Sequence, residues 1–232
     1  MNAVQDHIFA IQLSIKQLSQ GKFWLYLVPA LIVASVFYAI SSFFELVLGN
    51  SGFMGEIFQW LTKMTYTFVI LTLLSPVNCL LSEKVDNEIT GARFNGGLVR
   101  IINDMFRSIA IVIISSLLYL VIFGTWSMIS WILGLQSINP VMYFVLSSFF
   151  YGFAFYDYSY ERYEMEIWAT FRFGFSKFSH LLITGCMFNL IYLIPHVGLI
   201  LAPFLLTIVS TTVFLKMNGK ISNIPHNTGL SD

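Results

Sequence analysis

The chain has 232 residues, of which 57% are apolar and only 10% are charged, whereas soluble domains carry roughly a quarter charged residues. This composition leaves too few polar side chains to cover a water-facing surface, so it excludes an ordinary soluble fold. Twelve basic and twelve acidic residues give a formal net charge of zero, so nucleic acid is not an implied partner.

Charged residues are absent from four long stretches, which lie at residues 23–44, 64–82, 108–156 and 178–215. A membrane-spanning helix needs about 20 apolar residues, and in lipid every backbone polar group has to be paired within a helix or a closed barrel. The sequence therefore predicts an all-α fold. We expect one integral membrane domain that covers residues 1–232 and crosses the bilayer several times.

Residues 1–21 predict an amphipathic helix that lies in the membrane interface. Apolar residues recur there at spacings of three and four, and polar residues occupy the opposite face: Ile8, Ile11, Ile15 and Leu18 against Asp6, Gln12 and Lys16. One apolar and one polar face is the pattern of a helix parallel to the bilayer surface. Gly21 is expected to end this helix.

Two spanning helices are predicted next, at residues 23–47 and 57–82, with the loop between them outside the cell. The second span ends in SPVNCLLSEKVDNEITG, which opens as an apolar run and closes as a charged helix. Pro76 lacks a backbone donor and interrupts a helix, whereas Asn78 is a favourable N-cap residue. We therefore expect one helix to end at Pro76 and another to begin at Asn78, leading into a cytoplasmic segment at residues 83–107.

Two apolar hairpins are predicted in the rest of the chain, at residues 108–156 and 179–216. A cytoplasmic segment at residues 157–177 separates them, and a cytoplasmic tail at residues 217–232 follows. The first arm of the second hairpin, residues 179–194, would rise about 24 Å, which is less than the hydrocarbon thickness of about 30 Å. We expect this hairpin to enter the bilayer without fully crossing it.

The basic residues predict the orientation of the protein. Eleven of the twelve Lys and Arg lie in the N-terminal segment, in the two cytoplasmic segments or near the C-terminus, and only Lys63 lies elsewhere. By the positive-inside rule, these four regions face the cytoplasm. The protein is thus predicted to lie in the cell (inner) membrane with both termini on the cytoplasmic side.

No combination of side chains predicts an enzyme, because we find no nucleophile beside a base, no pattern of metal ligands and no cofactor motif. Cys79 and Cys186 are expected to be small buried residues, and His180 is expected at the membrane interface. Asp157 ends a charge-free run of 49 residues, so it is a candidate functional residue. The alternative is that Asp157 only caps its helix at the surface. Tyr156, Tyr158, Tyr160 and Tyr163 of the same block are expected at the lipid boundary, where amphipathic rings are favoured.

The predicted helix start at Asn78 is the most suggestive site. The first N–H groups of a helix have no partner within the helix and carry a partial positive charge, which suits an anion. Transporters place such helix ends within the membrane, where they face an anionic substrate. The alternative is a simple proline kink at the interface.

Three passages resemble the CysZ-type sulfate permease family, which shares its domain with the etoposide-induced membrane proteins. SPVNCLLSEKVDNEITG is similar to the family signature, in which a proline and an asparagine precede Gly-Leu-Leu-Ala-Glu. FYDYSYERYEME is similar to the family's Asp-Tyr block, and LIYLIPHVGLILAPFLLTIVSTTVF is similar to its C-terminal hairpin. The resemblance implies two long spanning helices, two hairpins that only partly penetrate the bilayer, a homo-oligomer and uptake of sulfate.

The resemblance also places sulfate where the signature helix begins. Carried over to this chain, the binding residues form the predicted anion seat: Asn78, Cys79, Leu80, Leu81, Ser82 and Glu83. The family has a pair of arginines near the start of the first span, at positions that Phe23 and Trp24 occupy in this chain. Lys22 is the basic residue next to them, and it is the candidate accessory charge.

Two functions follow as hypotheses. The first is a membrane permease or channel-like protein for sulfate or another small anion, which works in the lipid bilayer without a cofactor. The second is a non-transporting membrane scaffold or envelope-maintenance protein of the same fold. Polar residues that converge on one pathway would favour the first hypothesis, and an interior sealed by Phe and Leu would favour the second.

Overall fold

The structure is a computed structural model that describes residues 2–48, 53–92, 98–163, 165–194 and 197–221. All regular elements in these ranges are helices, which confirms the predicted all-α class for this part of the chain. In chain order they are α1 (Ala3–Ser19), the 3-10 helix η1 (Trp24–Tyr26), α2 (Leu27–Leu48), α3 (Phe53–Thr90), α4 (Leu98–Ile132), the 3-10 helix η2 (Gln136–Ile138), α5 (Asn139–Arg162), α6 (Ile167–Ser176), α7 (Phe178–Tyr192) and α8 (Gly198–Met217).

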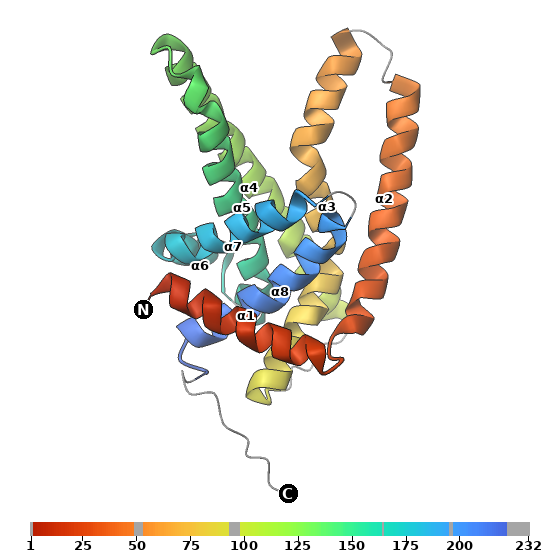
Figure 1. Ribbon diagram of the computed structural model, residues 1–232, viewed down its shortest axis with the longest axis vertical. Coiled ribbons are helices and arrows are strands. Elements are labelled where there is room, and N and C mark those ends of the chain that lie inside the picture. Colours follow the sequence, from red (N-terminus) through yellow and green to blue (C-terminus); the bar gives the residue numbers. More distant parts are fainter. Residues whose placement is uncertain (1, 49–52, 93–97, 164, 195–196, 222–232) are drawn as a thin grey trace, which may run out of the picture.

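Two long helix pairs and a crosswise layer make up the fold (Figure 1). α2 and α3 form one pair, and α4 and α5 form the other. α7 and α8 run crosswise between the two pairs, and α1 packs against both of them. α5 is the central helix, because it packs against α3, α4, α7 and α8.

Three stretches among the described residues are long and apolar enough to cross a membrane: Ile109–Ile132, Gln136–Arg162 and Ile200–Met217. They support the prediction of a membrane protein. The expected shortness of the first arm of the second hairpin is confirmed, since α7 has only 15 residues. Both arms of the first hairpin, in contrast, contain a stretch long enough to cross, although the family resemblance implies partial penetration.

The course of α3 differs from the expected break between two helices. α3 runs without interruption from Phe53 to Thr90, with Pro76 in its interior. The expectation that one helix ends at Pro76 and another begins at Asn78 is therefore wrong. A proline costs a helix one hydrogen bond and a steric clash, and membrane helices tolerate it where neighbouring helices pack around it. The expected cytoplasmic segment at residues 83–107 is not a separate unit either, because its first residues belong to the end of α3 and its last residues to the start of α4.

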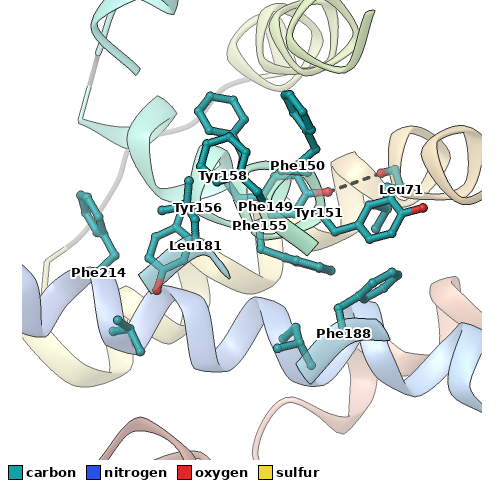
Figure 2. Packing of buried hydrophobic residues seen from close by; sticks show 14 of the residues in the cluster. Leu71, Phe149, Phe150, Tyr151, Phe155, Tyr156, Tyr158, Leu181, Phe188 and Phe214 are labelled. Atoms are coloured by element: carbon teal, nitrogen blue, oxygen red, sulfur yellow. Dashed lines mark hydrogen bonds between the residues drawn. The ribbon is translucent and has the colours of Figure 1, made fainter. Parts of the chain in front are cut away.

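The core is built around the aromatic C-terminal half of α5 (Figure 2). Residues 147–162 of this helix are all buried. Tyr156, Tyr158 and Tyr160, which we expected at the lipid boundary, are at most 3% exposed and lie inside the protein. The Tyr158 hydroxyl donates to the carbonyl oxygen of Leu71 on α3, at 3.4 Å (Figure 2). The centre of the fold is thus a segment that the sequence placed at its edge.

Glycines bring the backbones of α5 and α7 into contact. A Cβ atom on Gly152 of α5 would lie 1.9 Å from the carbonyl oxygen of Leu181. A Cβ atom on Gly185 of α7 would lie 1.6 Å from the carbonyl oxygen of Ser148. Small residues let helices approach this closely, and they are typical of helix packing within membranes.

α1 lies where the sequence predicts a helix, but its buried face is the polar one. The buried residues are Asp6, His7, Ala10, Ser14 and Gln17. The apolar residues Val4, Ile8 and Ile15 are 54%, 50% and 62% exposed. Because α1 packs on α7 and α8 mainly through polar groups, these three side chains remain on the outside, where an interfacial helix would meet lipid, whereas Ile11 is partly buried against the core.

Candidate functional site

A stripe of buried polar residues runs along the face of α3 that packs on α5 and α8. Its members recur at spacings of three and four and are at most 3% exposed: Ser75, Asn78, Ser82 and Asp86. Two of them, Asn78 and Ser82, belong to the predicted anion seat. Buried polar side chains of this kind need hydrogen-bond partners, and the central part of the stripe finds them on other helices.

Arg162, the last residue of α5, lies against the centre of this stripe. The side chains of Arg162 and Asp86 are both fully buried, and Arg162 Nε lies 3.4 Å from Asp86 Oδ2. Arg162 Nη1 donates to Ser82 Oγ at 2.5 Å, and Nη2 donates to Ser159 Oγ at 3.3 Å. Ser82 Oγ lies 2.5 Å from Thr211 Oγ1 on α8. We call Arg162, Asp86, Ser82 and Thr211 the Arg162 cluster, which joins α3, α5 and α8.

Asp86 has further donors besides the guanidinium. The Tyr163 hydroxyl donates to Oδ2 at 2.8 Å, and the Thr90 hydroxyl donates to Oδ1 at 2.9 Å. A buried ion pair is tolerated when the mutual attraction of the two charges and additional hydrogen bonds offset the loss of water. Asp86 meets that condition with partners on two helices.

The structure brings together only part of the predicted anion seat. Asn78 and Ser82 are buried on one face of α3 and Leu81 is buried on another, whereas Leu80 is 40% exposed. Successive side chains on a helix point in different directions, so six consecutive residues do not converge on one anion. With no helix start at Asn78, the N–H groups of the seat lie inside a continuous helix and are not free donors.

The remaining seat residues have other partners. Cys79 is buried, as expected, and its Sγ lies 3.9 Å from Glu161 Oε2. Lys22, the candidate accessory charge, forms an ion pair with Glu88, and its side chain is 38% exposed. Glu83 is half-buried. Lys22 is therefore a surface partner of the C-terminal end of α3, and its ion-pair partner is not a member of the Arg162 cluster.

Phe23 lies beside the seat, where the resemblance implies an arginine. It is buried and packs with four apolar residues of α3 and α8: Leu81, Val85, Phe204 and Ile208. Its backbone is left-handed, with φ = 71°, a conformation that costs a residue other than glycine about 1–2 kcal/mol. The start of the first span and the seat are thus neighbours, but their contact is apolar.

Asp157 is 2% exposed, so the alternative that it caps a helix at the surface is wrong. Its Oδ1 lies 3.1 Å from Nη2 of Arg107 on α4. The same guanidinium donates to Thr170 Oγ1 at 2.9 Å and to the carbonyl oxygen of Met165. Asp157 therefore belongs to an ion pair that joins α4 and α5 to α6 and the segment before it.

The Arg162 cluster contains the groups with which proteins bind small oxyanions. A guanidinium donates paired hydrogen bonds to oxyanions, and the hydroxyls of Ser82 and Thr211 add further donors. A bound oxyanion would take the place of Asp86 beside the guanidinium. Among the described residues no three candidate metal ligands are grouped, so a metal centre has no support there.

Sequence reasoning missed Arg162 as a site residue. Arg162 is the one basic residue in FYDYSYERYEME, a block with four acidic residues and four tyrosines. The signal was that this arginine lies only six residues after the charge-free run ends at Tyr156, and a charge so close to a membrane helix needs a partner. Its position on the chain did not reveal that the partner is the predicted seat.

No family model matches this chain, and no curated protein matches it either. The resemblance to the CysZ-type family therefore rests on the three passages quoted above.

Proposed function

We propose that this protein is an integral membrane permease or channel-like protein for a small anion, with sulfate as the first candidate. The observation that carries the proposal is the buried guanidinium of Arg162, which donates to Ser82 within the segment that resembles the sulfate-binding signature. Charged residues inside membrane proteins are costly and usually mark substrate or ion pathways. The protein would act in the inner membrane, with both termini in the cytoplasm, as a homo-oligomer.

The anion would bind by exchange with a carboxylate. Sulfate oxygens accept from the Arg162 guanidinium and from the hydroxyls of Ser82 and Thr211, while Asp86 gives up its place beside Nε. Asp86 would keep its bonds from Tyr163 and from α3 itself, so the carboxylate retains donors when the guanidinium turns to the anion. This exchange gives the site two states, which a permease needs.

A second candidate function is a non-transporting scaffold, and one observation favours it. The interior around α5 is filled by aromatic rings, and Arg162 and Asp86 already neutralise each other within it. In that case the Arg162 cluster serves only to hold α3, α5 and α8 together. The two functions make opposite predictions for transport.

The test is uptake of radioactive sulfate, phosphate and chloride, each measured separately, into liposomes that contain the purified protein. We expect uptake above that of protein-free liposomes. Arg162→Lys keeps the charge but loses the paired donors, and since a charge-assisted hydrogen bond contributes about 1.5–3 kcal/mol, uptake should fall about tenfold or more. Arg172→Lys, at an exposed arginine of α6, is the matched control and should transport like the parent.

Two results would refute the proposal. Uptake no faster than in protein-free liposomes, for all three anions, would favour the scaffold. Equal uptake by Arg162→Lys and Arg172→Lys would show that the Arg162 cluster does not bind the transported anion. Size-exclusion chromatography of each variant shows whether it is folded before uptake is compared.

A further inference from the structure

A second buried polar cluster lies where α1 packs on α7 and α8, apart from the residues of the proposed anion site. Asp6 Oδ2 of α1 lies 3.1 Å from His180 Nε2 of α7, and Asp6 Oδ1 lies 3.1 Å from Lys216 Nζ of α8. All three side chains are less than a tenth exposed. His180, expected at the membrane interface, is therefore a buried residue. We call these three residues, together with His7 and Thr184, the α1 cluster.

The bonds of His7 determine which of its nitrogens carries a hydrogen. His7 Nδ1 lies 2.7 Å from the carbonyl oxygen of Ala3, and because a carbonyl only accepts, Nδ1 is the donor. In the neutral ring Nε2 is then the acceptor, and the hydroxyl of Thr184 donates a hydrogen bond to it at 2.8 Å. Thr184 Oγ1 in turn lies 3.3 Å from the hydroxyl of Tyr156 on α5. His7 thus begins a hydrogen-bonded chain that reaches the core.

The α1 cluster is balanced in charge only when both histidines are neutral. Asp6 and Lys216 carry opposite charges and are in contact. Nδ1 of His180 is buried and has no hydrogen-bond partner among the described residues, so a proton there would be an unsatisfied donor. The ring centroids of His7 and His180 are 6.0 Å apart. A proton on His7 therefore adds one uncompensated positive charge to a buried interface.

We propose that His7 is a proton-binding residue whose protonation releases α1 from α7 and α8. The proton attaches to Nε2, and the Thr184 hydroxyl turns to donate to Tyr156. The titratable groups that interact with His7 are Asp6 on its own helix and His180 on α7. Lys216 of α8 joins this network through Asp6, and Tyr156 of α5 joins it through Thr184. The buried imidazolium is stabilised when α1 moves into water, so acid favours the released helix.

The pKa values of the two titratable groups on α1 agree with this direction. Burial lowers the pKa of His7, and the nearby His180 lowers it further, against the backbone carbonyl of Ala3 and the charge of Asp6. Burial by itself would raise the pKa of Asp6, but the bonds from His180 and Lys216 leave it below its ordinary value. The pKa of His7 is thus lower in docked α1 than in released α1. The neutral ring stabilises the docked helix fully at pH values above the pKa of the released helix. This stabilisation is lost as the pH falls from there toward the lower pKa of the docked helix.

Release of α1 has a direct route to the candidate anion site, and this step rests on the proposed function. Only residues 20–22 separate α1 from Phe23, whose ring packs on Leu81 and Val85 next to Ser82. The left-handed backbone of Phe23 makes the turn between the two helices strained. A released α1 would pull on this turn and loosen the packing beside Ser82, which would make anion transport dependent on pH.

The test is hydrogen–deuterium exchange of the full-length protein in detergent, read on peptides from α1 and corrected for the pH dependence of intrinsic exchange. The pH is stepped from about 7.5 to about 5.5, across the ordinary titration range of histidine. For each pH unit between the pKa of His7 in the released helix and its lower pKa in the docked helix, protection of α1 should fall by up to about tenfold. Peptides from residues 147–160 of α5 should stay protected.

Variants separate His7 from its neighbours. In His7→Gln the side-chain amide replaces Nε2 and accepts from Thr184, and in His7→Asn it replaces Nδ1 and donates to the carbonyl oxygen of Ala3. Neither amide titrates, so α1 should stay protected at both pH values. His180→Gln should keep the pH dependence of the parent, because His7 is still present. The proposal is overturned if α1 of the parent is equally protected at both pH values, or if either amide variant that is docked at the higher pH is released at the lower one.

Sulfate uptake at the two pH values distinguishes the two proposals. Release of α1 in a protein that transports no anion would support the proton-binding role of His7 and refute the permease. Sulfate uptake without any release of α1 at the lower pH would support the permease and refute the proton-binding role of His7.

Discussion

Gly185, where an added Cβ would meet the nearest obstacle of all the described glycines, gives the sharpest prediction about the stability of the fold. At Gly185 of α7, an added Cβ would lie 1.6 Å from the carbonyl oxygen of Ser148 on α5, about half of an ordinary carbon–oxygen contact of about 3.3–3.6 Å. The obstacle is backbone on a packed helix, so it cannot rotate away like a side chain. Gly185→Ala therefore has to push α5 and α7 apart.

The size of the effect follows from two opposing contributions. Overpacking a filled interior costs about 1–3 kcal/mol, and the backbone clash places Gly185→Ala at the upper end of that range. Alanine favours a helix over glycine by about 0.8–1.0 kcal/mol, so the net loss is about 2 kcal/mol. For a chain of this size each kcal/mol shifts the Tm by about 2–4 °C, which predicts a fall of roughly 4–8 °C.

Gly124→Ala is the matched control, because this helical glycine of α4 has nothing within 4 Å of the added Cβ. Its Tm should equal or exceed that of the parent. Both variants are purified in one detergent, and the apparent Tm is measured from the loss of folded protein on size-exclusion chromatography after heating. The reasoning fails if Gly185→Ala is as stable as Gly124→Ala, since α5 and α7 would then not be in backbone contact.

Three further predictions concern charges in the interior, two at buried ion pairs and one at a buried apolar position. Arg162→Met should lower the free energy of unfolding by about 3–5 kcal/mol, because it leaves Asp86 buried without its guanidinium, and a double variant with Asp86→Leu should recover most of the loss in the same thermal assay. A double variant less stable than Arg162→Met would contradict this. Asp6→Asn leaves its lysine partner on α8 buried without a counter-charge, so α1 should exchange deuterium rapidly even at neutral pH. If α1 of this variant is as protected as α1 of the parent, the ion pair does not hold the helix in place. Phe23→Arg should lower the Tm more than the same change at the half-exposed Trp24, because Phe23 is buried among apolar side chains; the opposite order would show a polar pocket there.

The broad character of the protein is determined by its sequence, because it depends on local properties of the chain. Long charge-free stretches predict membrane helices from composition alone, and the described residues contain three apolar helical stretches of spanning length. The extent of α1 and the shortness of α7 were also predictable, since Gly21 and the length of one apolar run decide them. Each of these features involves neighbours along the sequence.

Only the tertiary structure decided the course of α3 and the burial of the charges. Pro76 is a local signal for a break, but packing against neighbouring helices keeps α3 continuous, and this removes the helix start on which the predicted anion seat depended. Arg162 lies 80 residues from Ser82, and His7 lies 177 residues from Thr184, so no local pattern links either pair. A polar side chain looks the same in a sequence whether it meets water or a partner on another helix, and in this protein the interior of the fold supplies the partners.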